Sequence, residues 1–173
     1  SGRRKSELVL FKVSYFDSEN VIYGSLYKTP EKLKTKGRGL GKYIYRYTLK
    51  HQFDPYLNMW MGKRIQLNIN SEWLFVVKRG DDWERATPDT LNSWANICSS
   101  ILGVPFYFHA LRHYYTTTLV KQNIPDSLIQ QIIGWTNADM VRVYDDSPSD
   151  EKLAQYFGEN GIKDVPQKSL GEL

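Results

Sequence analysis

The chain has 173 residues, a hydrophobic content of 41% and a formal net charge of +4, which suits one domain with a sizeable buried core. It contains no run of 18 apolar residues, so we expect no membrane-spanning helix. Its polar first residues are unlike a signal peptide. Cys98 is the only cysteine, which excludes an internal disulfide and a cysteine-based zinc site. We therefore expect a cytoplasmic protein without membrane contact.

Basic residues are concentrated at one end of the sequence. Residues 1–50 carry twelve Lys and Arg against four Asp and Glu, whereas residues 145–173 carry three against seven. A basic region beside an acidic tail suggests a polyanionic partner for one end of the protein. Charged runs are also common on ordinary solvated surfaces, so charge alone does not establish nucleic-acid binding.

The first third of the chain predicts a helix end followed by a basic β-hairpin. Residues 6–16 begin with polar residues and become apolar, as at the end of a helix that runs into a connector. We therefore expect a fragment that lacks the N-terminal part of its protein. Residues 21–28 and 42–49 are rich in Tyr, Ile and Val and predict strands. Three glycines between them favour a turn, and residues 28–50 hold eight basic residues and one acidic residue.

Helical patterns dominate the remainder. We predict a helix over residues 55–64, a strand or buried connector over residues 72–78, and then four helices at residues 87–103, 108–121, 123–134 and 137–144. Capping residues support them: Thr87 and Pro88 begin one helix, Pro125 lies in the first turn of another, and Gly134 ends it. A short amphipathic helix is expected near residues 152–157. The predicted fold is α+β, mainly helical with a small antiparallel sheet that bears the basic hairpin. Residues 1–157 form this domain and residues 158–173 a polar tail.

His109 and Arg112 attract notice without any family in mind. They are three residues apart on a predicted helix and so project from one face. Together they suit a phosphate, because arginine offers a planar fork of donors and histidine offers another. An isolated His-x-x-Arg pattern is more often a core histidine beside a surface ion pair, so the pair needs further support.

That support comes from the order of three motifs, by which the chain resembles the tyrosine recombinase (phage integrase) family. Residues 1–8 read SGRRKSEL, which fits the family's small–Gly–x–Arg–x–Ser–Glu–Leu motif and places its first catalytic arginine on Arg4. Residues 109–113 read HALRH, the family's His-x-x-Arg-His. Gly134 and Trp135 match a Gly-His/Trp motif, and Tyr144 follows nine residues later as the nucleophile. The match covers nearly the whole chain.

The resemblance implies a role for each residue. Tyr144 attacks the scissile phosphate and forms a 3′-phosphotyrosyl link, while Arg4 and Arg112 hold the non-bridging oxygens. His109 acts as a base or a phosphate donor. Trp135 replaces a histidine and has one N–H, so it donates to phosphate but cannot transfer a proton. The reaction requires no metal or other cofactor, and the sequence shows no carboxylate cluster for one.

In this family a hairpin lysine protonates the leaving 5′ oxygen. Lys36 lies in the Thr-Lys-Gly sequence at the turn and is our first candidate. Lys34 has the same strand parity and is the alternative. Lys34, Arg38 and Lys42 are also expected to contact the DNA backbone.

Two supporting residues are open to alternative interpretations. Glu7 lies one turn from Arg4 and either orients it or is an ordinary surface carboxylate. His113 is expected to support the site or to pack in the core rather than to take part in catalysis.

The implied function is site-specific cleavage and rejoining of double-stranded DNA at attachment sites. We expect this reaction to integrate or excise a mobile element, and the protein to act as a nucleoid-associated tetramer. Three alternatives remain open. A type IB topoisomerase or telomere resolvase uses the same chemistry. A DNA-binding regulator on a recombinase scaffold would bind without cleaving. An α+β module that does not bind DNA would leave the basic hairpin and the motif series unexplained.

Overall fold

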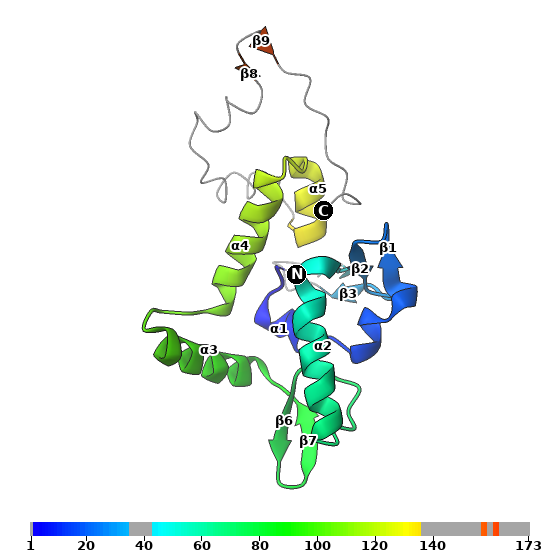
Figure 1. Ribbon diagram of the computed structural model, residues 1–173, viewed down its shortest axis with the longest axis vertical. Coiled ribbons are helices and arrows are strands. Elements are labelled where there is room, and N and C mark those ends of the chain that lie inside the picture. Colours follow the sequence, from blue (N-terminus) through cyan, green and yellow to red (C-terminus); the bar gives the residue numbers. More distant parts are fainter. Residues whose placement is uncertain (1, 35–42, 136–156, 159–160, 163–173) are drawn as a thin grey trace.

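The computed structural model describes residues 2–34, 43–135, 157–158 and 161–162. The described residues have the predicted α+β architecture, with a long central helix, α2, flanked by the sheet on one side and by α3 and α4 on the other (Figure 1). No helix in these ranges combines the length and the hydrophobicity that a membrane span requires.

The antiparallel sheet contains the predicted basic hairpin. Strands β1 (Val21–Ile22), β2 (Leu26–Lys28) and β5 (Tyr47–Leu49) pair in the order β1-β2-β5. Further along the hairpin, β3 (Leu33–Lys34) pairs antiparallel with β4 (Tyr43–Ile44). The pairing of both arms confirms the hairpin on either side of residues 35–42.

Residues 21–28 do not form the single strand that their composition predicted. Tyr23 has a φ of 52° and Gly24 a φ of 71°, so the chain reverses there and Ile22 pairs with Leu26. Glycine adopts this backbone conformation at no steric cost. The side chain of the adjoining Tyr23 is 75% exposed, so it does not clash with the rest of the protein. The segment therefore becomes a small hairpin, β1–β2.

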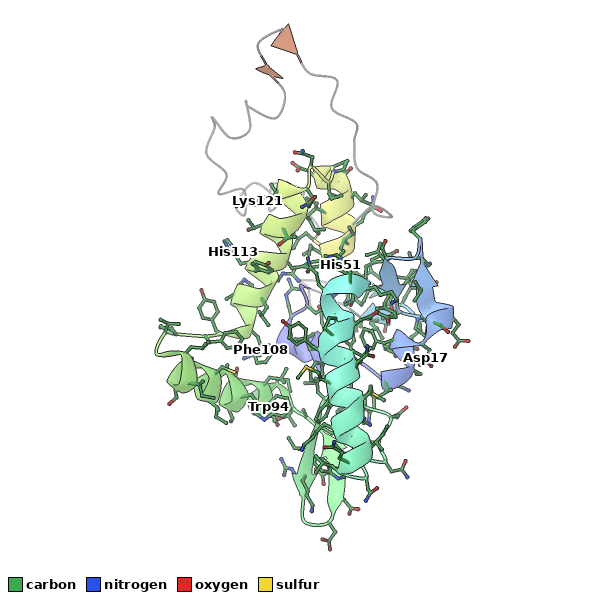
Figure 2. The ribbon with its side chains drawn as sticks, viewed as in Figure 1. Asp17, His51, Trp94, Phe108, His113 and Lys121 are labelled. Carbon is green, nitrogen blue, oxygen red and sulfur yellow. The ribbon has the colours of Figure 1, made fainter. Side chains whose placement is uncertain are left out.

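Helix α2 (Lys50–Gln66) begins five residues before the predicted start at Pro55. Proline removes one helical hydrogen bond to the carbonyl four residues earlier. That carbonyl belongs to His51, which is exposed in the first turn of α2 (Figure 2). The helix therefore tolerates Pro55 inside it and extends beyond the predicted start.

A second hairpin lies beside the C-terminal end of α2 (Figure 1). It consists of β6 (Val76–Arg79) and β7 (Asp82–Arg85), which turn at Gly80 with a φ of 59°. The sequence predicted an extended segment at residues 72–78 but not β7. Strand β7 carries three charged residues, and it forms because its ladder with β6 satisfies the backbone of both strands.

Three of the four predicted later helices are confirmed as α3 (Pro88–Leu102), α4 (Phe108–Lys121) and α5 (Asp126–Ile133). The Thr87 hydroxyl caps α3 by accepting from the Thr90 amide, and Gly103 ends it with a φ of 69°. Pro125 precedes α5 instead of lying in its first turn. The helix expected at residues 137–144 lies outside the described residues.

The C-terminal prediction is described only in part. Most of the helix expected near residues 152–157 lies outside the described ranges. Phe157 belongs instead to a short strand, β8 (Phe157–Gly158), which pairs with β9 (Gly161–Ile162). The division at residue 157 into a domain and a tail stays a prediction.

The main core joins the sheet to α4 and α5. Its buried members come from β2, β5, α4, α5 and the segments after α4 and α5: Leu26, Leu49, Tyr115, Leu119, Ile124, Ile129, Ile132, Ile133 and Trp135. A smaller cluster joins the short helix α1 (Lys5–Leu8) to α3 and α4, where Trp94 and Phe108 (Figure 2) pack against Val9 and Leu91. These two clusters hold the start of the chain, α4 and the end of α5 together.

Gly134, which ends α5, has a backbone conformation and a position that demand glycine. Its φ is 79°, and a Cβ there would lie 2.4 Å from Ile44 Cδ1. We expect Gly134→Ala to lower the free energy of unfolding by about 1–3 kcal/mol, because left-handed strain adds to the clash. Gly62→Ala in α2 is the matched control, since a Cβ there meets nothing within 4 Å; it should be neutral or stabilise by up to about 1 kcal/mol. Urea denaturation measures both, and equal effects would contradict this account.

Candidate active site

The start of the chain is fixed against α4. Gly2 has a φ of 56°, and a Cβ on it would lie 2.5 Å from Tyr115 Cδ1, so glycine permits the close approach. The buried guanidinium of Arg112 on α4 donates from Nη1 to the Gly2 carbonyl oxygen at 2.8 Å. This contact brings the first motif beside the second.

Two arginines meet the C-terminal end of α5. Arg3 Nη2 donates to the Ile132 carbonyl at 2.6 Å, and Arg112 Nη2 donates to the Ile133 carbonyl at 3.4 Å. The last carbonyl groups of a helix lack helical donors and carry partial negative charge, so cations are favourable there. The arginines thereby join the end of α5 to the other two motifs.

Trp135 lies directly beyond this helix end and is 8% exposed. The guanidinium carbon of Arg112 lies 5.3 Å from the centre of its ring, within the range of a cation–π contact. Arg112 therefore contacts residues of both the first and the third motif.

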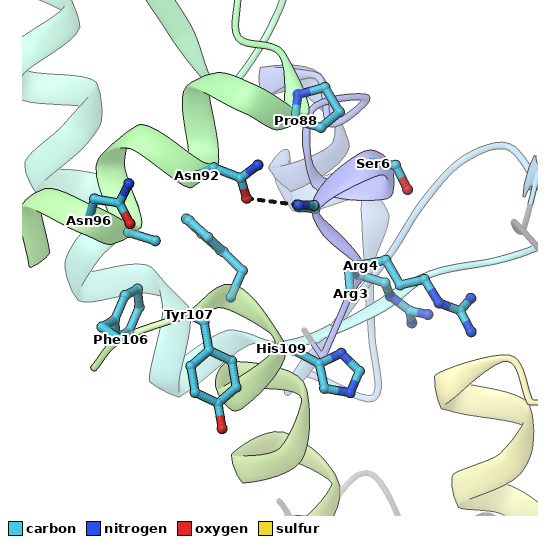
Figure 3. Close-up of a pocket in the computed structure, with 12 residues that line it drawn as sticks. Arg3, Arg4, Ser6, Pro88, Asn92, Asn96, Phe106, Tyr107 and His109 are labelled. Atoms are coloured by element: carbon cyan, nitrogen blue, oxygen red, sulfur yellow. Dashed lines mark hydrogen bonds between the residues drawn. The ribbon is translucent and has the colours of Figure 1, made fainter. Parts of the chain in front are cut away.

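His109 and Arg4 extend the site toward solvent. Figure 3 shows them projecting to the same side, Arg4 from the start of α1 and His109 from the first turn of α4. The pKa of His109 lies below its ordinary value, first because the ring is partly withdrawn from water, and also because Arg112, Arg4 and His113 add positive charge. The side chain of Arg4 remains 36% exposed. The site therefore offers an accessible cation beside a histidine that favours its neutral form.

Glu7 orients Arg4, which was one of its two interpretations. Its side chain is only 5% exposed, so it is not a surface carboxylate. Glu7 Oε2 accepts from the Arg4 amide at 3.2 Å, and Oε1 lies 3.7 Å from Arg4 Nη1. The same Oε1 pairs with Arg46 Nη2 at 3.1 Å. A buried carboxylate thus holds two arginines from different segments.

The structure thus brings together Arg4, His109, Arg112 and Trp135 of the predicted catalytic residues. Lys34 is exposed on β3, opposite Tyr43. The other predicted residues lie outside the described ranges: Lys36, Arg38, Lys42 and Tyr144. Their roles stay predictions.

His113 does not pack in the core. It is exposed one turn beyond His109 on α4 (Figure 2), and its Nδ1 lies 3.4 Å from the Thr117 hydroxyl. An electrostatic interaction with His113 is among the lesser causes that lower the pKa of His109, so His113 influences the site through space.

Sequence reasoning missed two buried arginines, Arg3 and Arg46, which are 2% and 1% exposed. Burial is the first cause that lowers the pKa of each, and Arg46 also lowers that of Arg3. Arginine is seldom buried, and both lie in a basic region that resembled a solvated surface. The sequence held no signal for Arg46. For Arg3 the only signal was its place beside the motif arginine.

Among the described residues there is also no group of three or more His, Cys, Asp and Glu side chains that could hold a metal ion.

Comparisons with known proteins agree with the motifs. The sequence profile of the phage integrase family matches residues 1–151. The integrase of Salmonella phage P22 is 28% identical over 88 residues, which cover 46% of this chain and 23% of that protein. Tyrosine recombinase XerA of Pyrococcus horikoshii is 27% identical over 75 residues, which cover 43% of this chain and 26% of the relative.

Solved structures share the fold. A crystal structure of XerA recombinase has a TM-score of 0.65 at 20% identity, and the match covers 91% of this chain and 54% of that one. XerH site-specific recombinase bound to palindromic difH substrate, a post-cleavage complex, has a TM-score of 0.59 at 21% identity, over 88% of this chain and 41% of that one. The matched region thus spans about a quarter of the curated relatives and about half of the solved chains.

The electrostatic coupling of His109 is measurable. We expect its pKa, followed by NMR titration, to lie below the ordinary 6.5. Arg4→Gln should raise it, because a neutral neighbour no longer opposes protonation. Lys5→Gln is the matched control: it removes a positive charge from the next residue, whose Nζ instead donates to Asn92 Oδ1 at 2.7 Å (Figure 3). An equal rise in both variants would mean that Arg4 has no particular relation to His109.

Proposed function

Because this chain belongs to the phage integrase family, we propose that it is the catalytic domain of a site-specific recombinase that cleaves and rejoins DNA through Tyr144. The observation that carries the proposal is the convergence of three motifs on Arg112. Arg112 contacts Gly2 of the first motif and the ring of Trp135 of the third. His109 lies one turn away on α4, and its pKa is lowered by partial burial and by the positive charges of Arg112 and Arg4. Such a cluster of cationic donors suits a phosphate diester.

The arginines supply the electrostatic part of the mechanism. When the Tyr144 oxygen attacks the scissile phosphorus, negative charge develops on the two non-bridging oxygens. Arg4, held from behind by Glu7, binds one side of this group. Arg112 supplies positive charge on the other side, from a guanidinium that is 1% exposed and donates to two backbone carbonyls. Fixed donors that need no reorganisation stabilise such a transition state strongly.

His109 handles the proton of the nucleophile. A phenol has a pKa of roughly 10 and must lose its proton as it attacks. Because partial burial, and after it nearby positive charge, lowers the pKa of His109, its imidazole is mainly neutral at pH 7 and accepts that proton. Trp135 donates its indole N–H to a phosphate oxygen and takes no part in proton transfer.

A hairpin lysine completes the cleavage step. The bond between phosphorus and the 5′ oxygen breaks, and the lysine ammonium gives its proton to that oxygen. The products are a 3′-phosphotyrosyl ester and a free 5′ hydroxyl. Attack by a new 5′ hydroxyl reverses these steps and releases Tyr144, so rejoining consumes no nucleotide.

The substrate is double-stranded DNA at attachment sites, and the biological role is integration or excision of a mobile element. The basic hairpin supports DNA as the partner, with Lys34, Arg38 and Lys42 along the backbone. The relative from phage P22 is an integrase, and the XerH structure is bound to a DNA substrate. Assembly into a tetramer on DNA and association with the nucleoid complete the proposal.

Covalent trapping tests the nucleophile. With full-length protein and a nicked suicide DNA that contains the attachment site, wild type should form an adduct that survives a denaturing gel. Tyr144→Phe should form none and should keep its DNA affinity, because only the attacking oxygen is lost. Tyr114→Phe, which changes an exposed tyrosine on α4, is the matched control and should form the adduct.

The alternatives give other results. Tight site-specific binding by wild type without any adduct would indicate a DNA-binding regulator. Adducts on unrelated DNA, with relaxation of supercoils, would indicate an enzyme of the type IB topoisomerase kind. Absent or salt-insensitive DNA binding would indicate a module of another class.

A substrate with sulphur at the 5′ bridging position identifies the general acid. A thiolate leaves without a proton, so loss of the acid should matter little on this DNA. We expect Lys36→Ala to slow cleavage of ordinary DNA by about 100-fold or more and to approach wild type on the sulphur substrate. Lys34→Ala should affect both substrates alike, through binding. The reverse pattern would assign the acid to Lys34.

A further inference from the structure

Arg46 occupies the base of the hairpin, between β4 and β5. It is 1% exposed, which is unusual for an arginine in a basic region. Its backbone is tied across the hairpin to Thr29: the Arg46 amide donates to the Thr29 hydroxyl at 3.0 Å, and the Thr29 amide donates to the Arg46 carbonyl at 2.9 Å. Arg46 is therefore fixed in place before its side chain is considered.

The side chain connects the hairpin to the phosphate-binding arginine. Arg46 Nη2 donates to the Lys34 carbonyl at 3.3 Å and to Glu7 Oε1 at 3.1 Å. Glu7 in turn holds Arg4 through its backbone amide and its guanidinium. One nitrogen atom thus joins the last described residue of the outgoing hairpin arm to the carboxylate that orients Arg4.

The guanidinium also lies beside the turn of the third motif. A Cβ on Gly134 would lie 3.4 Å from Arg46 Nη1, so the guanidinium lies where a side chain at this position would meet it. Arg46 is therefore close to the hairpin, to the first motif and to the end of α5.

We propose that Arg46 is a positioning residue that sets the hairpin lysine relative to the scissile phosphate, through its bonds to Lys34 and Glu7. The proposal rests on the proposed function. Its physical basis is that proton transfer to the leaving oxygen depends on the distance between the lysine and the phosphate held by Arg4. The bonds of Arg46 connect Glu7, which holds Arg4, to Lys34, and so fix the described end of this hairpin arm relative to Arg4.

The energetics do not favour a purely stabilising role. Arg46 Nε and Nη1 are buried and have no hydrogen-bond partner among the described residues. Unsatisfied buried donors cost stability, and a buried ion pair is often no better than a well-packed apolar side chain. The main role of Arg46 is therefore to connect Lys34 of the hairpin to Glu7.

The test compares cleavage rates of full-length protein on ordinary and 5′-bridging-sulphur suicide DNA. We expect Arg46→Met to slow cleavage of the ordinary substrate on the order of 100-fold, as a misplaced catalytic group does, and to cleave the sulphur substrate within about threefold of wild type, because that step needs no acid. Arg46→Lys keeps a charge beside Glu7 and should give the same pattern. It decides the matter if the methionine variant does not fold.

The matched control is Arg64→Met. Arg64 is also a buried arginine that donates to backbone carbonyls, with Nη1 2.9 Å from the Trp73 oxygen, but it lies in the last turn of α2. It should change both rates by the same factor. Equal losses on the two substrates in the Arg46 variants, or no loss, would overturn the proposal. A wild-type protein inactive on both substrates would instead overturn the proposed function.

Discussion

The binding of arginines to the C-terminal carbonyl groups of α5 is the interaction on which the site depends. Arg3 and Arg112 come from segments far apart in the sequence and meet at Ile132 and Ile133. A helix end needs donors, and here side chains of the first two motifs supply them. The same contacts that complete α5 therefore place Trp135 beside Arg112. Fold and site therefore share these hydrogen bonds.

The cluster is also electrostatically unbalanced. Arg3, Arg46 and Arg112 are each at most 2% exposed, and Glu7 is the only buried carboxylate among the described residues. Burial lowers the pKa of Arg3, and the like charges of Arg46 and Arg112 lower it further, because like charges at short range oppose one another. An anion bound nearby relieves that repulsion. This charge density therefore suits the phosphate diester of the proposed function.

Local patterns in the sequence predicted most of the elements and the convergent residues. The caps at Thr87 and Gly103, the hairpin and the pair His109 and Arg112 follow from short-range signals. Arg4 and Trp135 follow from the resemblance to the family's motifs. The turn at Tyr23 and the strand β7 were missed because pairing partners decided them. Arg3 and Arg46 were missed for a deeper reason: whether an arginine is buried depends on carbonyl and carboxylate groups supplied by distant segments. No local pattern records such a partner.

The close approach of Gly134 to Ile44 has an evolutionary consequence. The two residues belong to segments far apart in the sequence, yet they share one small volume. A side chain at position 134 leaves less room at position 44. Relatives with a residue other than glycine at position 134 should therefore have a residue smaller than isoleucine at position 44. In an alignment of relatives, covariation between positions 44 and 134 would then mark where the hairpin meets the end of α5, even in sequences whose structures have never been determined.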